Sequence, residues 1–406
     1  MHSLLACLAA PLFLVANAQE VPKGPDTVKL VKNGVVEQGR VVFEGKDEIV
    51  LRTDRKELHI ARADIAEIHS LERSLAAILD RDLKTTDPAA LSAIARDCEQ
   101  AGLKAEAHNF WLRVLLVDPK NPSAVKAVGA RVVKDEVTVG FGKDKRPLAE
   151  LTKRQASWEQ AFEIQSTHFR LRSDFDLPLA LDASLAFERN YRRFYETLGE
   201  PLEMFIFDED PEVCIYGRAA DFPPAPLKGD SVWFAPGINR LNVLTETNPK
   251  VRDIIHELIR MMLFNALRRS AGTTTQVPQW ASTGIAELFA IAAPAERFGT
   301  WSEIGRPDAD VFGLAKSAHA DLARMFNASV NDFNADRKRG ELTAAAYSLV
   351  HYLVFGKDRA LRAGFGKFLR EGAKGKISLG ALSEALGTPI EEIESGWIAY
   401  VDANAR

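Results

Sequence analysis

Apolar residues alternate with charged ones over residues 27–68, which is the pattern of half-buried β-strands. The dipeptide Asn33-Gly34 lies between two such runs and is a strong signal for a tight hairpin turn. Short strands at this spacing predict a small closed barrel or a strongly bent sheet. We therefore expect a small β module over residues 24–70.

The pattern changes to a helical period after residue 70, and we expect a helical connector over residues 71–150. Asp87-Pro88 is a helix start, Gly102 separates two helices, and Asp118-Pro119 stops the second one. The segment resembles about one tetratricopeptide-type (TPR-like) unit, but a single unit has no neighbour on which to bury its faces. The β module before it resembles the SH3-like or Sm-like modules that precede other domains in exported bacterial proteins.

The chain beyond residue 150 combines strand patterns with helical ones. Strand patterns lie over residues 162–173, 202–208, 212–217, 231–235 and 240–245. An amphipathic helix is expected over residues 178–199, and helices dominate from Asn248 to the end. A small sheet followed by a helical half predicts an α+β domain.

The first residues have the form of a secretory signal peptide, residues 1–18. Leu4–Val15 is almost wholly apolar, and Ala16-Asn17-Ala18 gives the small-x-small pattern of a cleavage site. The apolar run is too short for a bilayer, and no later stretch reaches the ~18 apolar residues of a membrane helix. We expect cleavage near Ala18, a periplasmic or extracellular location, and no membrane span in the mature chain.

Composition excludes several classes of protein. The 406 residues are 46% hydrophobic and 27% charged, with a net charge of −4, as in soluble globular proteins. This charge balance gives no support for nucleic-acid binding, which needs a concentrated basic face. Cys98 and Cys214 are expected to be buried thiols, although a disulfide between them stays open.

One expected helix carries the candidate chemistry. Asn248-Pro249 should start it and Gly272 should end it, and the run HELIR lies within it at residues 256–260. A zinc peptidase has histidine at the last of these positions. Side chains at i and i+4 project from one helical face, so two imidazoles converge on one ion. The glutamate between them then takes a proton from zinc-bound water.

A second helix is expected over VPQWASTGIAELFA, residues 277–290. The pair resembles the gluzincin metallopeptidases, in particular the peptidase MA-like group of exported bacterial proteins. Their pattern is His-Glu-x-x-His, then Pro-x-Trp-Leu-x-Glu-Gly-x-Ala-Glu, whose first glutamate is the third zinc ligand. The segments at residues 344–353, 364–375 and 382–401 look like that group's closing helices. The resemblance covers residues 160–403 and implies a gluzincin-like domain with a small sheet subdomain and a helical subdomain.

The resemblance assigns a role to each matching position. The first histidine ligand falls on His256, and the general-base glutamate on Glu257. The second histidine ligand falls on Arg260, and the ligand glutamate on Thr283. The second-shell acid one turn later falls on Glu287.

Two of the three zinc ligands are therefore absent. Arginine has no acceptor atom, and a threonine hydroxyl is a poor substitute for a carboxylate. Because Arg260 supplies a positive charge and Thr283 removes a negative one, the sum of charges is unchanged. We expect an internal polar network in which Arg260 pairs with Glu257 and also reaches Glu287, and we expect no cofactor. A tyrosine of the family falls on Thr343 or on the nearby Tyr347.

Other candidate residues have simpler interpretations. His351 on an apolar helix and His168 on a strand are expected in packing roles, and His319 on a polar helix face. The charged run at residues 336–340 is expected to be a solvated turn. The sequence contains neither a G-x-S-x-G elbow nor a phosphate-binding loop.

Three functions follow as hypotheses. The first is a pseudopeptidase, in which the vestigial base Glu257 and vestigial ligand His256 lie in a cleft that binds a peptide or protein. The second is an active zinc endopeptidase or aminopeptidase with an irregular metal site. The third is a structural envelope protein.

Overall fold

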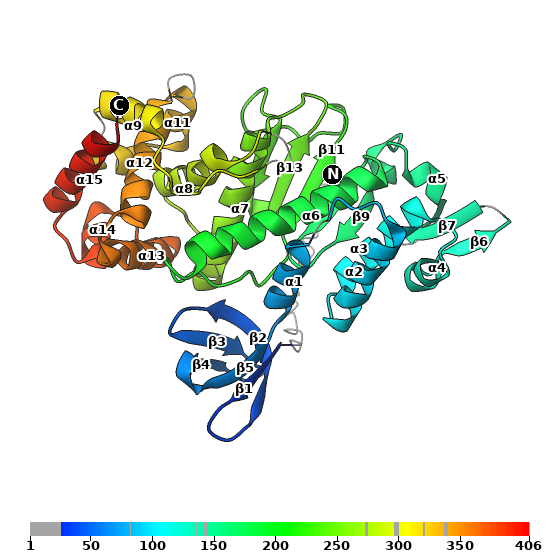
Figure 1. Cartoon of the computed structure of the whole chain (residues 1–406). Coiled ribbons are helices and arrows are strands. Elements are labelled where there is room, and N and C mark those ends of the chain that lie inside the picture. The colour runs from blue at the N-terminus through cyan, green and yellow to red at the C-terminus, as the bar shows by residue number, and fades with distance from the viewer. Residues whose placement is uncertain are drawn as a thin grey trace, which may run out of the picture.

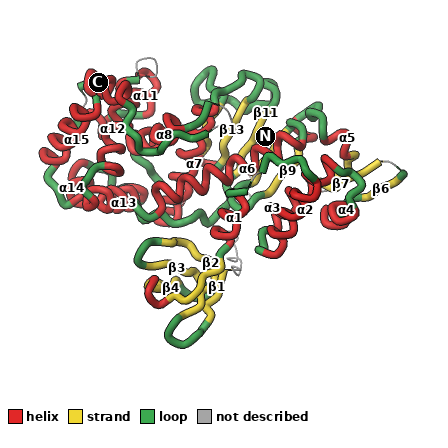
Figure 2. The backbone as a smooth tube through the Cα atoms, viewed as in Figure 1, coloured by secondary structure: helices red, strands yellow, loops and turns green. Residues whose placement is uncertain are grey.

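The chain is a mixed α/β protein, with a β-rich N-terminal part, a central sheet and a helical C-terminal part (Figure 1). The computed structural model describes residues 26–81, 83–134, 136–141, 144–272, 275–295, 300–319, 321–336 and 340–405. The expected signal peptide lies outside these residues. Figure 2 shows the strands confined to three separate places, which are the three sheets.

The N-terminal sheet is antiparallel and has the strand order β4-β3-β2-β1-β5. Its strands are β1 (Asp26–Leu30), β2 (Val36–Glu44), β3 (Glu48–Arg52), β4 (Glu57–Ala61) and β5 (Ile65–His69). Gly34 adopts a left-handed φ of 66° in the β1–β2 turn, as the Asn-Gly signal predicts. The described residues form no ladder between β4 and β5, so the expectation of a closed barrel is wrong and the sheet is open at both edges.

A β-bulge in β2 connects this sheet to the rest of the protein. The register shifts between Val41 and Phe43, so two adjacent valines are buried in different places. Val41 packs in the sheet's own small core, whereas Val42 belongs to the main core of the molecule. The carbonyl of Val42 accepts a hydrogen bond from the backbone N–H of Ile206 at 3.0 Å.

The connector is helical only in its first part. Its helices are α1 (Leu71–Leu79), α2 (Pro88–Gln100), α3 (Lys104–Val117) and α4 (Pro122–Val128). A three-stranded antiparallel sheet follows, made of β6 (Arg131–Val133), β7 (Glu136–Phe141) and β8 (Asp144–Pro147), and then the short α5 (Leu148–Leu151). The expectation of helix up to residue 150 is wrong there, because three very short strands give too brief an alternation to stand out.

The central sheet has the order β12-β13-β11-β10-β9, with β10, β11 and β13 parallel. Its strands are β9 (Phe162–Gln165), β10 (Arg170–Ser173), β11 (Glu212–Tyr216), β12 (Val232–Ala235) and β13 (Arg240–Leu244). The predicted single strand over residues 162–173 is instead a hairpin with a turn at 166–169. Residues 202–208 form no strand, because they pack as irregular chain after the helix.

Helices α6 and α7 pack against the central sheet, and β12 is its edge strand next to α7. Helix α6 (Leu177–Phe194) continues into a π-type turn, η3 (Tyr195–Gly199), and runs along the length of the molecule (Figure 1). Leu241 and Val243 of the inner strand β13, which pairs with β12, are buried in the main core. This sheet therefore holds β12 firmly beside α7.

The C-terminal part is helical. It contains α7 (Val251–Ala271), α8 (Gln279–Ala292), α9 (Ala309–Ala318), α10 (Leu322–Asn327), α11 (Val330–Asp336), α12 (Glu341–Phe355), α13 (Arg359–Ala373), α14 (Leu379–Leu386) and α15 (Ile390–Asn404). Helix α8 packs between α7 and α12. In the part of the chain that the structure describes, no helix is both long and apolar enough to span a bilayer.

The candidate helix ends as predicted but begins later. Gly272 is its C-cap with a left-handed φ of 65°. Its N-cap is Lys250 rather than Asn248, because Asn248 adopts a left-handed φ of 51° in the preceding turn.

Candidate functional site

Helix α7 brings three of the five predicted site residues together, and the other two lie on the neighbouring helix α8. His256, Glu257 and Arg260 lie within two turns of α7, on the side that meets β12 and α8. The side chains of these three residues are 23%, 14% and 28% exposed, respectively, so solvent can reach the cluster. Thr283 and Glu287 lie one turn apart on α8 and are both buried.

Glu257 is the centre of the cluster and is bound from two elements. Arg260 Nη1 donates to both carboxylate oxygens, at 2.9 Å to Oε1 and 3.1 Å to Oε2. The backbone N–H of Phe234 on β12 donates to Oε2 at 3.1 Å. His256 Nδ1 lies 3.2 Å from Oε1. Both oxygens are therefore occupied by groups of the protein itself.

These contacts fix the charge of Glu257. Its burial alone would raise the pKa, but the charge of Arg260 and the hydrogen bond from His256 outweigh burial and lower the pKa to about 2. A general base works best when its pKa lies near the working pH. A carboxylate held this far below neutrality beside a fixed cation is a weak acceptor for a proton from water.

The two residues on α8 do not join the cluster directly. Arg260 Nε donates to the hydroxyl of Ser282 at 3.3 Å, and Thr283 accepts from Gln279 Nε2 at 3.1 Å. Glu287 pairs with Arg252, one turn before His256 on α7. The expectation that Arg260 reaches Glu287 is therefore wrong, because Arg252 already occupies that carboxylate.

The residues present do not fit a zinc ion. His256 and Glu257 are the two side chains of ligand type in the cluster, and Arg260 directs N–H groups at the carboxylate that a metal would need. Over the described residues, no three His, Cys, Asp or Glu side chains gather so that they could hold a metal ion. A structural zinc site needs four such ligands, and a catalytic one needs three.

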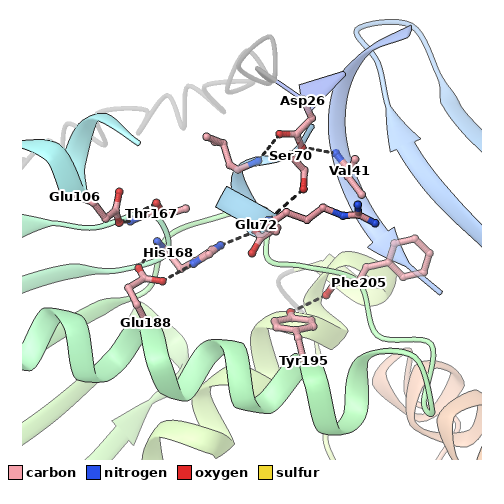
Figure 3. Close-up of polar contacts among 12 residues, drawn as sticks. Asp26, Val41, Ser70, Glu72, Glu106, Thr167, His168, Glu188, Tyr195 and Phe205 are labelled. Carbon is pink, nitrogen blue, oxygen red and sulfur yellow. Dashed lines mark hydrogen bonds and ion pairs between the residues drawn. The ribbon is translucent and has the colours of Figure 1, made fainter. Parts of the chain in front are cut away.

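A second polar cluster, which the sequence analysis missed, surrounds His168 (Figure 3). His168 does not lie on a strand but in the turn between β9 and β10, and only 1% of its side chain is exposed. Its ring lies between the carboxylates of Glu72 and Glu188. These two attractions outweigh burial, which opposes charge, and raise the pKa of His168 to about 10. The sequence feature that could have indicated this cluster is a set of three glutamates on the apolar faces of their helices, where the helical period predicts buried residues. These are Glu72, Glu106 and Glu188.

The other candidates have structural roles. His351 is buried in α12 between the hydroxyl of Tyr400 and the carbonyl of Gly305, each at 2.9 Å, which confirms its packing role. His319 is the C-cap of α9 in a left-handed conformation rather than a residue on a helix face. Cys98 and Cys214 are free and buried, as predicted.

The remaining positions lie apart from the cluster. Tyr347, the alternative to Thr343 in the family pattern, is buried in α12, where its hydroxyl accepts from the N–H of Asp308 at 3.3 Å. Thr343 is half-buried near the start of the same helix. The turn expected at residues 336–340 falls largely outside the described residues.

Comparison of the chain with protein-family models, with curated proteins and with solved structures gives no match. The family resemblance therefore depends on the residues of the two helices and the closing segments.

Proposed function

We propose that this chain is an exported, catalytically inactive relative of the gluzincin-type, peptidase MA-like metallopeptidases, and that it binds a peptide or protein segment. One observation carries the proposal: Arg260 and the N–H of Phe234 occupy Glu257 at the position of the family's general base. The guanidinium of Arg260, which is part of the chain, takes the place of a zinc ion, which could dissociate. Water activation by a metal is then lost, whereas the surface around the helix pair remains.

The binding activity is proposed from the edge of the central sheet. Strand β12 is an edge strand, and the N–H of Phe234 faces away from β13 toward α7, where Glu257 binds it. An extended peptide can add to the remaining part of this edge through its main chain, beginning at the outward-facing N–H of Val232. Such a segment would lie alongside Glu257. The SH3-like character of the N-terminal sheet and the export of the chain belong to the same proposal.

Metal analysis tests the loss of the zinc site. After incubation with equimolar zinc and gel filtration, the wild-type protein should retain far less than one zinc ion per chain and should not cleave casein. The double variant Arg260→His with Thr283→Glu restores three ligands and should bind zinc near one per chain. Its matched control, Arg260→Ala with Thr283→Ala, removes the same side chains without adding ligands. Stoichiometric zinc in the wild type, with chelator-sensitive cleavage, would overturn the proposal.

Strand addition is tested at Val232, whose N–H also faces the free edge by alternation with Phe234. Immobilised wild-type protein should retain unfolded casein, and Val232→Pro should lose it. Proline at an outward-facing edge position removes that donor without breaking a ladder bond to β13. Equal retention by both proteins would exclude β12 as the binding edge. Export is tested separately, since the N-terminal sequence of the mature protein should begin at Gln19.

A further inference from the structure

Four segments that are distant in the sequence meet at the turn of residues 166–169 (Figure 3). His168 in this turn is bound by Glu72 from α1 and by Glu188 from α6, and its neighbour Thr167 is bound by Glu106 from α3. The turn itself belongs to the β9–β10 hairpin. The N-terminal part, the connector and the central sheet are therefore joined at one buried point.

Both ring nitrogens of His168 face carboxylates. Nδ1 lies 2.7 Å from Glu188 Oε2, and Nε2 lies 2.8 Å from Glu72 Oε1. The backbone N–H of His168 donates to the other oxygen of Glu188 at 2.8 Å. Two donors on one imidazole require the protonated ring, so the turn carries one buried positive charge. The ring of Tyr191 stacks on it at 3.5 Å between centroids.

Glu106 is the third carboxylate at the turn, and it is only half satisfied. Its Oε1 accepts from the N–H of Thr167 at 2.7 Å and from the Thr167 hydroxyl at 2.9 Å. Its Oε2 is buried and has no hydrogen-bond partner in the part of the chain that the structure describes, and the residue is 2% exposed. Burial and the nearby charge of Glu188 raise the pKa of Glu106 to about 7. A proton on Oε2 removes the third negative charge from the turn.

Other titratable groups also face the turn. Asp210, before β11, has its pKa raised by burial, and Arg40 on β2 partly offsets the charges of Glu72 and Asp210. Burial raises the pKa values of Tyr191 and Tyr195 on α6 well above their usual range, so both stay neutral. The guanidinium of Arg40 and the imidazolium of His168 therefore face the carboxyl groups of Glu72, Glu106, Glu188 and Asp210. Glu44 on β2 also acts on Glu72, but it is paired with Arg62 and Arg73.

The N-terminal sheet is tied to this cluster through the start of α1. Asp26 of β1 is buried and accepts from the N–H of Leu71 at 2.8 Å and from the N–H of Val41 at 2.7 Å (Figure 3). Glu72, the next residue of α1, reaches the ring of His168. The turn is therefore connected to β1 and β2 through two adjacent residues, Leu71 and Glu72.

We propose that this turn is a pH-sensitive latch that holds α1 and the N-terminal sheet on the body. The latch is closed while Glu106 carries a proton and is weakened when Glu106 ionises. An ionised Glu106 adds a negative charge close to that of Glu188, and among the described residues its Oε2 has no donor to receive the charge.

The direction of the pH dependence follows from linkage. The pKa of Glu106 is higher in the closed latch, about 7, than in an open chain, about 4.5. The closed state is therefore favoured fully below pH 4.5, and this advantage is lost as the pH rises through 7. His168, with its raised pKa of about 10, acts in the same direction but only above pH 6.5. Comparison of pH 5.0 with pH 6.5 lies mostly below the range of His168. Burial also raises the pKa values of Asp26 and Asp210, so a variant at position 106 is needed to separate Glu106 from them.

Hydrogen exchange on the full chain tests the latch. Amide exchange is measured at pH 5.0 and pH 6.5 and corrected for the intrinsic pH dependence of exchange. In the wild type, the segments at residues 26–44, 71–79 and 166–169 should open about twentyfold more at pH 6.5, as linkage requires for such a pKa difference. Helix α12, remote from the turn, is the internal reference and should not change.

The variant Glu106→Gln has no titrating group at position 106, so most of the difference in protection between pH 5.0 and pH 6.5 should disappear from these segments. The proposal is overturned if the wild type shows no difference, or if Glu106→Gln keeps it. Thr167→Val serves if the glutamine variant does not fold. Loss of its hydroxyl removes a bond that favours the ionised Glu106 in the closed latch, so the closed-state pKa rises further and the opening of these segments should grow over a wider range, continuing above pH 7. An unchanged pH dependence of opening in Thr167→Val would also count against the latch.

Discussion

Glu257 illustrates how one carboxylate can link a helix to a strand. It receives the guanidinium of Arg260 from its own helix and the N–H of Phe234 from β12. These donors stabilise the carboxylate as an anion. Without them, water could solvate only the small exposed part of the side chain, so the anion would be poorly compensated. The loss of stability on removing Arg260 therefore depends on the Glu257 carboxylate, which would be left without its cation.

Arg260→Ala should destabilise the protein by about 1–3 kcal/mol, because Glu257 then lacks its cation in a mostly buried place. Urea unfolding at pH 7 measures the change. The control is Lys316→Ala, which breaks the ion pair with Asp402, whose two side chains are 56% and 52% exposed. That change should stay within about 0.5 kcal/mol. Equal effects of the two substitutions would mean that Glu257 is well solvated.

The buried, neutral imidazole of His351 should make the protein less stable in mild acid. Burial lowers its pKa to about 4, against about 6.5 in an unfolded chain. Between these values the unfolded chain binds a proton that the folded chain does not, so stability falls as the pH drops from 6.5 to 4, by roughly 3 kcal/mol at most. Unfolding free energies of the wild type and of His351→Gln, measured at pH 6.5 and 4.5, should differ in slope. Parallel slopes would contradict the buried neutral ring.

The residues of the candidate site could be predicted only in part from the sequence. Glu257 and Arg260 are three residues apart on one helix, so their contact could be predicted from helical geometry alone. The partner of Glu287 could not be found in this way. Arg252 and Arg260 both lie on α7 within reach of α8, and the choice depends on the offset between two packed helices.

At the scale of elements, helix boundaries were predictable where a local cap determines them. Asp87 and Gly272 act as cap residues of α2 and α7. Three short strands before α5 and the turn in the β9–β10 hairpin were missed, because their pairing depends on partners rather than on a local signal. His168 was misplaced for this reason.

The packing of α8 against α12 depends on a small residue. A Cβ atom at Gly284 would lie 2.4 Å from the carbonyl oxygen of Ala346 and 2.6 Å from Cγ2 of Val350. Gly284→Ala should therefore destabilise the protein by about 1–3 kcal/mol, since the two helices must separate. Gly313→Ala on α9 is the control, because its Cβ meets nothing within 4 Å. It should stabilise the protein by about 0.5–1 kcal/mol through helix propensity. Thermal unfolding compares them, and two changes of the same sign would contradict this packing.

At the scale of the whole molecule, the question is whether the N-terminal sheet is a separate module. The alternating sequence pattern predicts a unit with its own core, and Val28, Val41, Ile49 and Leu51 form one. The pattern did not predict that the β2 bulge would turn Val42 into the main core. Arg52 also reaches Asp208 at 2.6 Å, and Glu57 pairs with Arg269 of α7. These contacts make the sheet part of the body.

Calorimetry of two adjacent substitutions tests this integration. Val41 and Val42 are both buried, the first in the core of the sheet and the second in the core of the body. If the sheet and the body unfold together, Val41→Ala and Val42→Ala should each lower the midpoint temperature of one common transition. Each substitution should reduce the free energy of unfolding by about 1–3 kcal/mol. If the sheet were an independent module, Val41→Ala would instead split off an earlier transition while the main one stayed in place. A single transition that moves in both variants therefore requires that the contacts across the junction are strong enough to couple the two cores.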